Sequence, residues 1–188
     1  MAEPHDPGGK VRLPMLPGVD GWARVSDDGR FRHSLCRDWS LRRFTDGRAH
    51  YALWIGMNPS TADAEVDDPT IRREIEFTKR IAAEQMLPVE CYWKCNVMDF
   101  RATSPKDLVR PGVTPCSDEN IVAIRGLADR AAIIVACWGK VHKSLRCYPD
   151  RILSELRGRP LWCLGKNADG SPRHPLYLAG DTPLERFR

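Results

Sequence analysis

The chain has 188 residues, of which 42% are hydrophobic, so it is long enough to bury one sizeable core and too short for two ordinary domains. Lysine and arginine total 29 against 25 aspartate and glutamate, and the net charge of +4 permits a phosphate-bearing partner without requiring one. No run approaches the roughly 18 apolar residues of a membrane span, and the first residues lack the pattern of a secretory signal. We therefore expect a cytoplasmic protein that does not bind membranes. The composition leaves its oligomeric state open.

The first 20 residues are rich in proline and glycine and have no apolar period, which predicts a flexible lead before a single α/β domain at residues 21–188. Residues 22–26 and 30–37 flank Asp27-Asp28-Gly29, and Asp-Gly between alternating segments is a strong hairpin signal. A second turn, Thr45-Asp46-Gly47, leads into an apolar strand at residues 51–55. An antiparallel hairpin should therefore precede the core.

Strand and helix patterns alternate along the rest of the chain. Asp68 can cap a helix whose buried stripe runs from Ile71 to Met86 and which ends near Pro88. The same signals predict strands at 89–97, 131–138 and 161–165, a loop at 100–115, and helices at 117–130 and 149–156. The order predicts an α/β three-layer sandwich: a short, mainly parallel four-stranded sheet, right-handed crossovers, and helices on both faces.

Seven cysteines are scattered along the chain, and none forms a C-x-x-C pair. Cys91 and Cys95 are four residues apart in a strand and so share one face, while Cys137 and Cys163 sit in apolar runs. We expect reduced core thiols and neither a metal nor another cofactor. An iron–sulfur or zinc site is the alternative, but the regular ligand spacing is missing.

The first polar signature, Gly56-Met57-Asn58-Pro59-Ser60, directly follows the strand at 51–55. Glycine lets a backbone approach a ligand and proline fixes the turn, so Asn58 would project from a rigid elbow. Its amide offers a donor and an acceptor and can hold a water for attack. The alternative is a turn that only closes the strand.

Aspartates and a second asparagine extend this edge of the sheet. Asp68 is explained as a helix cap, whereas Asp63 and Asp67 could each act as a general base or bind a cation. Asn96 ends the strand at 89–97, where its amide could read the edge of a planar base, with Arg101 close behind. Hydrogen bonds to the local backbone are the alternative role for Asn96.

The third strand closes with Trp138-Gly139-Lys140, where glycine would admit a ligand and Lys140 and Lys143 could contact phosphate. These lysines open a basic stretch at residues 140–159, which has six cations against two acids. A phosphate-binding surface and an ordinary solvated helix face are both open.

The fourth strand leads to Arg173-His174-Pro175-Leu176-Tyr177. His174, restrained by proline, could stabilise a leaving anion, and Leu176 beside Arg173 could push into a base stack. A simple His-Pro turn is the alternative.

These segments together resemble the domain-of-unknown-function family 1643, an uncharacterised bacterial and phage group. The matching patterns are N-P-S-T-A-D, D-D-P-T-I-R-R, N-x-x-x-x-R-A-T-x-P, W-G and G-x-P-R-H-P-L-Y, which begin here at residues 58, 67, 96, 138 and 170. The resemblance covers about residues 22–184 and implies no reaction.

More remotely, the layout is similar to the uracil-DNA glycosylase superfamily, with its G-x-[DN]-P and H-P-S-P-L segments. That resemblance implies a glycosylase-like fold in which Asn58 positions water, Asn96 reads the base, His174 stabilises the leaving group and Leu176 is the wedge. The Ser-Pro between His-Pro and Leu is absent here. By this resemblance the catalytic residues are Asn58 or Asp63 with His174. The candidate substrate contacts are Gly56, Met57, Pro59, Ser60, Asn96, Arg101, Trp138, Gly139, Arg173 and Leu176.

The expected activity is hydrolysis of the N-glycosidic bond of a nucleobase in DNA or in a nucleotide, without a cofactor. An enzyme on free or modified nucleotides and a non-catalytic nucleic-acid-binding module are the alternatives.

Overall fold

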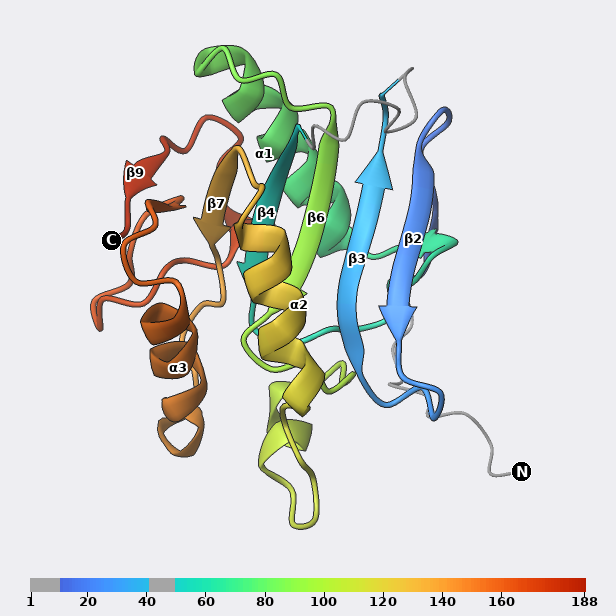
Figure 1. Cartoon of the computed structure of the whole chain (residues 1–188), viewed down its shortest axis with the longest axis vertical. Coiled ribbons are helices and arrows are strands. Elements are labelled where there is room, and N and C mark those ends of the chain that lie inside the picture. Colours follow the sequence, from blue (N-terminus) through green and yellow to red (C-terminus); the bar gives the residue numbers. More distant parts are fainter. Residues whose placement is uncertain (1–10, 41–49) are drawn as a thin grey trace.

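The computed structural model of the protein describes residues 11–40 and 50–188. A seven-stranded mixed sheet forms its centre, in the order β2-β3-β6-β4-β7-β8-β9 (Figure 1). These strands are β2 (Asp20–Val25), β3 (Arg32–Asp38), β4 (Tyr51–Gly56), β6 (Cys91–Asn96), β7 (Ile133–Ala136), β8 (Leu161–Cys163) and β9 (Glu185–Arg186). The four predicted core strands β6, β4, β7 and β8 are mutually parallel. The predicted turn at 45–47 lies outside the described residues.

The expectation of a four-stranded sheet is wrong, because three antiparallel strands extend the parallel core. The predicted hairpin is confirmed as β2 and β3, and β3 also pairs with β6, so the hairpin joins the sheet. At the other edge β9 pairs with β8. A two-residue strand is too short to show an alternating pattern, which is why the sequence did not reveal β9.

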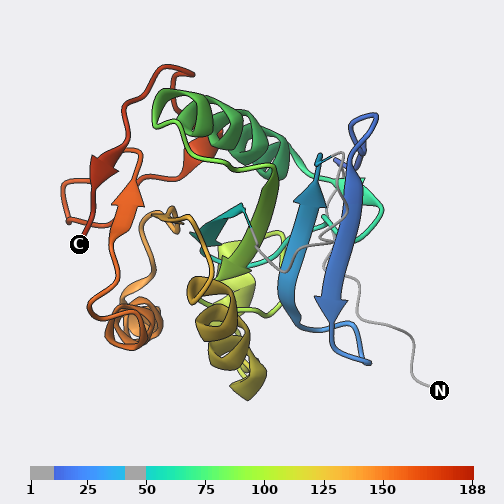
Figure 2. The same cartoon turned by 45° about the horizontal axis from the view of Figure 1, so that its top comes forward.

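Three α-helices cover the sheet: α1 (Pro69–Glu84), α2 (Asp118–Ala128) and α3 (Cys147–Glu155). Helix α1 lies on one face, and α2 and α3 lie on the other (Figure 2). The predicted cap is present, because the Asp68 side chain accepts from the Ile71 N–H at 2.9 Å. The helix ends four residues before Pro88, however, so Met86 lies beyond it and is 90% exposed. The prediction that Met86 is buried is therefore wrong.

Short 3-10 helices complete the loops: η1 (Pro105–Val109), η2 (Lys143–Leu145) and η3 (Pro175–Tyr177). Within residues 11–20, β1 (Leu13–Pro14) pairs antiparallel with β5 (Val66–Asp67), so this part of the N-terminal lead docks on the segment before α1. Among the described helices, none combines the length and apolar character that crossing a membrane requires.

The alternation of side chains along each strand builds two cores. Leu53 and Ile55 of β4 pack towards α2 and α3, while Trp54 packs towards α1. Cys91 and Cys95 share the first core, as predicted, whereas Cys137 lies in the second. Each face of the sheet is therefore buried by its own helical layer.

Candidate functional site

The chain reverses direction across the sheet between β4 and β7. From β4 it crosses to β6 on one side, and from β7 it crosses to β8 on the other. In an open parallel sheet such a switch point leaves a crevice at the carboxyl ends of the strands, where ligands bind. The loops that leave this point begin at Gly56 and Cys137.

Beneath these loops, between the sheet and α1, lies a cluster of four buried polar side chains: Glu74, Tyr92, Lys94 and Cys137. Lys94 Nζ donates to Glu74 Oε1 at 2.5 Å, and the Tyr92 hydroxyl donates to the other carboxylate oxygen. The Cys137 thiol lies 3.3 Å from Glu74 Oε1 and 3.5 Å from Lys94 Nζ. We call this set the buried polar cluster.

The buried polar cluster carries one ion pair and two neutral donors. Burial raises the pKa of Cys137 well above its ordinary value, and the Glu74 carboxylate reinforces the shift, so the sulfur stays a thiol. Burial and Glu74 likewise raise the pKa of Tyr92. Burial alone would lower the pKa of Lys94, but the Glu74 carboxylate, which pairs with the ammonium group and accepts its hydrogen bond, outweighs burial and raises that pKa. Lys94 therefore stays an ammonium ion.

Asn96 lies beside this cluster and is 1% exposed. Neither its Oδ1 nor its Nδ2 has a hydrogen-bond partner among the described residues. Gly56 pairs with Asn96 in the sheet, and a Cβ there would come within 3.0 Å of Asn96 Oδ1 and 2.5 Å of Lys94 Nζ. Only glycine fits this position without displacing the ammonium ion or the amide.

His174 approaches the same region from the far end of the chain. It caps η3, and its Nδ1 accepts from the Leu176 N–H at 3.4 Å. Burial and then the Lys94 ammonium lower the pKa of His174, against the opposing pull of Glu74 and Asp68. At neutral pH the ring is therefore uncharged, and because Nδ1 accepts, its proton sits on Nε2 as a donor.

Gly139 lies against His174: a Cβ at position 139 would be 3.5 Å from the histidine Cβ. The φ angle of Gly139 is +69°, which favours glycine. The loop after β7 and the His-Pro segment are thus neighbours. The structure brings together Gly56, Lys94 and Asn96, and it brings His174 beside Gly139 and within electrostatic reach of Lys94.

The side chains of Asn58 and Asp63 both form hydrogen bonds with backbone groups. Asn58 Nδ2 donates to the carbonyls of Pro59 at 2.9 Å and Ala102 at 2.6 Å, which uses both amide hydrogens and leaves Oδ1 as the acceptor. Asp63 Oδ1 accepts from the N–H groups of Glu65 and Val66, as in an aspartate turn. The Asp63 side chain therefore stabilises the loop.

The remaining aspartates of this loop also have structural partners. Asp67 is buried and accepts from Arg37 Nε at 2.7 Å and Arg72 Nε at 2.5 Å. Asp68 caps α1. Within residues 11–40 and 50–188, no three histidine, cysteine, aspartate or glutamate side chains are grouped so that they could hold a metal ion.

The other predicted contacts are spread around the switch point. Pro59 is buried, Ser60 is half-buried, and Met57 packs against the core that faces α2. Trp138 is buried on that same face, edge-on to Phe187 with ring centroids 5.5 Å apart. Arg101 Nη1 donates to the Gly29 carbonyl at 3.0 Å.

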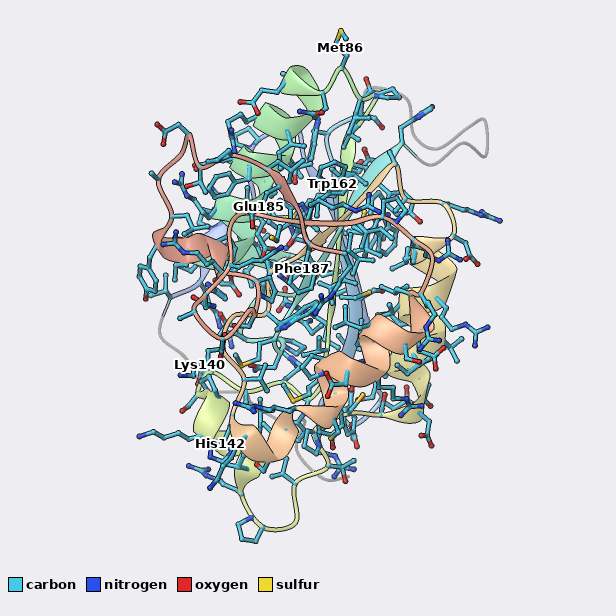
Figure 3. All side chains as sticks on the ribbon, turned by 90° about the vertical axis from the view of Figure 1, so that its left-hand side faces the viewer. Met86, Lys140, His142, Trp162, Glu185 and Phe187 are labelled. Carbon is cyan, nitrogen blue, oxygen red and sulfur yellow. The ribbon has the colours of Figure 1, made fainter. Side chains whose placement is uncertain are left out.

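Four predicted contacts lie nearer the surface. Arg173 is exposed, and its side chain lies against the backbone of Gly165, where an added Cβ would come within 3.2 Å of Arg173 Cδ. Leu176 is half-buried, whereas its neighbour Tyr177 is 88% exposed. Lys140 and Lys143 are exposed, and Figure 3 labels Lys140 near His142.

Sequence reasoning missed Glu74 and Lys94, and it predicted Cys137 only as a core thiol. The signals were present: Glu74 lies on the apolar stripe of α1, and Lys94 is a lone charge inside an apolar strand. A charged residue at a position that periodicity assigns to the core is rarely tolerated without a partner.

His33, Asp99 and Ser117 resemble a nucleophilic triad in composition but not in geometry. His33 Nδ1 lies 2.8 Å from Asp99 Oδ2, and the Ser117 hydroxyl donates to that same oxygen at 2.5 Å. A triad needs the serine and the carboxylate on opposite ring nitrogens. Because the Ser117 N–H also donates to Asp99, the group fixes the start of α2.

A family model described as "Protein of unknown function (DUF1643)" matches residues 32–176. No curated protein matches the chain, and no solved structure does.

Proposed function

The chain belongs to the DUF1643 family, whose description names no reaction, and we propose from the site that it hydrolyses the N-glycosidic bond of a nucleobase. The observation that carries the proposal is the Asn96 amide at the carboxyl end of β6, next to Gly56, whose donor and acceptor are buried without a partner among the described residues. Such a group costs free energy of folding unless a ligand pairs with it.

The Asn96 amide suits the edge of a planar heterocycle. Asparagine forms paired hydrogen bonds with a base that offers an adjacent acceptor and donor, a pattern that nucleobases share. The Gly56 backbone approaches this amide so closely that a Cβ at position 56 would come within 3.0 Å of Asn96 Oδ1, so only glycine leaves the amide in place there. Asn96 is thus the proposed base-reading residue.

His174 and Lys94 supply the electrostatics that such a cleavage needs. When the bond between C1′ and the ring nitrogen breaks, its electron pair leaves with the base as an anion. A neutral His174 can donate from Nε2 to that anion, while the buried Lys94 ammonium adds positive potential behind it. The base then takes a proton from solvent.

Water must add to C1′ of the oxocarbenium-like sugar. Asn58 is the proposed residue for holding it, because both amide hydrogens are bonded to carbonyls and only Oδ1 remains to accept from water. Asp63 is the weaker candidate, since its carboxylate closes a turn. The water loses its proton to solvent, and the products are an abasic sugar and the free base.

The remote similarity to the uracil-DNA glycosylase superfamily supports this assignment of roles. That resemblance rests on the signatures at residues 56–59 and 174–176, which follow the parallel strands β4 and β8. For the wedge, Tyr177 is a second candidate beside Leu176, because its ring is 88% exposed next to His174.

The test is a panel of DNA single strands and duplexes containing uracil, mismatched or modified bases, assayed for abasic sites. Wild type should produce them from at least one substrate, whereas Asn96→Leu and His174→Gln should lose at least a hundredfold in rate, in line with the loss of a positioned donor. His142→Gln is the matched control, because His142 is exposed and its ring bonds to the neighbouring Ser144.

Absence of abasic product from the whole panel would overturn glycosidic hydrolysis for those substrates. A thermal shift with free nucleotides but none with oligonucleotides would favour an enzyme on free or modified nucleotides. Salt-dependent DNA binding without turnover would favour a binding module.

A further inference from the structure

Two adjoining hollows run along α3 on the side of the molecule shown in Figure 3. The first, of about 390 Å³, extends from Trp138 and Gly139 over the start of α3 to Phe187. The second, of about 440 Å³, continues past the end of α3 to Leu161. Asp150, Leu153 and Arg188 line both, so the two hollows form one depression that we call the α3 groove.

The α3 groove is basic. Its cations come from three separate segments of the chain and are Arg146, Arg157, Arg159, Arg186 and Arg188, and its acids are Asp150 and Asp169. Among the described residues only Arg159 of these five forms an ion pair with a carboxylate, that of Asp129. The other four guanidinium groups remain available for an anion.

Two aromatic side chains line the first hollow of the groove. Phe187 contacts Trp138 edge-on, and the guanidinium of Arg188 lies 5.4 Å from the Phe187 ring centre. The Arg186 guanidinium lies 5.5 Å from the Trp162 ring, which packs with the core that faces α1 and does not line the groove. Stacking against a ring holds an arginine in place and leaves its N–H groups free to bind phosphate.

One end of the groove reaches the proposed base pocket. Gly139 lines the first hollow and also lies against His174, so it belongs to both. The other end lies beyond α3, at Arg157 and Arg159. The cations therefore extend away from the pocket along the length of α3, farther than one nucleotide phosphate beside the pocket would need.

We propose that the α3 groove binds the sugar-phosphate backbone of a nucleic-acid strand whose target base enters the pocket at His174. This rests on the proposed function and deepens it, because it identifies the substrate as a polynucleotide rather than a free nucleotide. Arginines clamp successive phosphates without reading sequence, so the groove fixes the register of the strand while Asn96 reads the base. Of the basic stretch at residues 140–159, Arg146, Arg157 and Arg159 line the groove, whereas Lys140, Lys143 and Arg151 do not.

The test measures binding of a fluorescein-labelled single strand of 12 abasic sugar-phosphate units, which contains no base to excise. Fluorescence anisotropy compares wild type with the double variant Arg146→Glu/Arg157→Glu at several salt concentrations. Both arginines are exposed, so the variant should keep the wild-type circular dichroism spectrum and thermal midpoint. The matched control is Lys106→Glu/Arg110→Glu, two exposed cations on η1 and its C-cap, outside the groove.

The groove variant should bind at least tenfold more weakly, and its slope of log K against log salt should be shallower by about 1.4, for two lost phosphate contacts on a single strand. The control should stay within twofold of wild type. If both variants bind equally more weakly, or if wild-type binding does not depend on salt, the α3 groove is not the binding site for the sugar-phosphate backbone.

The two proposals fail separately. Salt-dependent binding that is lost only in the groove variant, with no excision from any substrate, keeps the groove and overturns the glycosidic reaction. Excision that is unchanged in the groove variant keeps the reaction and overturns the groove. Asn96→Leu should bind the abasic strand like wild type, because it leaves all five arginines in place.

Discussion

Replacing Asn96 with leucine should make the protein more stable while abolishing its function. Asn96 is buried, and both polar atoms of its amide lack partners among the described residues. A buried polar group without a partner costs about 1–3 kcal/mol, and leucine has a similar branched shape without that cost. We expect the free energy of unfolding to rise by about 2 kcal/mol, which corresponds to a thermal midpoint about 4–8 °C higher for a chain of this size.

The matched control is Asn120→Leu, at a second buried asparagine nearby. Its Nδ2 donates to the carbonyls of Asn96 at 3.0 Å and Val97 at 3.4 Å. The Asn120 Oδ1 has no partner among the described residues, so the change removes one unpaired acceptor together with the bonds of Nδ2 to two carbonyls and the Cys116 sulfur. Because the lost bonds outnumber the one unpaired atom removed, the free energy of unfolding should fall by about 1 kcal/mol. Two chemically identical substitutions should thus have effects of opposite sign.

Urea denaturation of the three proteins, monitored by tryptophan fluorescence, measures both effects. If Asn96→Leu is destabilised as much as Asn120→Leu, the Asn96 amide has a structural partner and its role as a ligand group is refuted. If it is stabilised and also loses abasic-site formation, the side chain is retained for function at the expense of stability.

Three further predictions test the rest of the site. Lys94→Met alone should lower the free energy of unfolding by about 3–5 kcal/mol, because it leaves the Glu74 carboxylate buried without its cation. Adding Glu74→Gln should restore part of that loss. If the effects of the two substitutions simply add in a double-mutant cycle measured by urea unfolding, the ion pair is contradicted. The pKa of His174 lies below its ordinary 6.5, so the unfolded chain binds the proton more readily and stability should rise as pH increases towards 6.5. The free energy of unfolding, measured in urea at pH 5, 6 and 7, should rise less with pH in His174→Gln than in wild type. If it rises equally in both proteins, His174 is not buried as a neutral ring. Gly56→Ala should lower the free energy of unfolding by about 1–3 kcal/mol, because the added methyl group displaces Lys94. Gly126 lies in α2 with open space around it, so Gly126→Ala should raise the free energy of unfolding by about 0.5–1 kcal/mol. Changes of the same sign in both variants would refute the close approach of Gly56 to Lys94.

The core elements could be predicted from the sequence because their signals are local. Runs of apolar residues gave β6, β7 and β8, and a cap with proline gave the start of α1. The order of the strands depends on contacts between distant segments, which no local pattern encodes. Met86 shows the same limit, since the period of α1 continued in the sequence after the helix had ended.

The candidate site was predictable only in part. Strand ends pointed to Gly56, Asn96 and His174, and the rule for parallel sheets placed them at one edge. The sequence could not show that the Asn58 amide hydrogens bind Pro59 and Ala102, because the partner on Ala102 lies 44 residues away. The pairing of Lys94 with Glu74 escaped prediction for a similar reason. It joins strand β6 to helix α1, and the two residues are 20 positions apart in the sequence.

The family match spans residues 32–176, so the outermost strands of the sheet, β2 and β9, both lie beyond it. Each covers a flank of the shared core: β2 shields β3, and β9 shields β8. A fragment trimmed to the matched region would present two rows of unpaired amides and carbonyls, a template for adding strands from other molecules. The strands that the family model leaves unmatched thus form both edges of the described sheet.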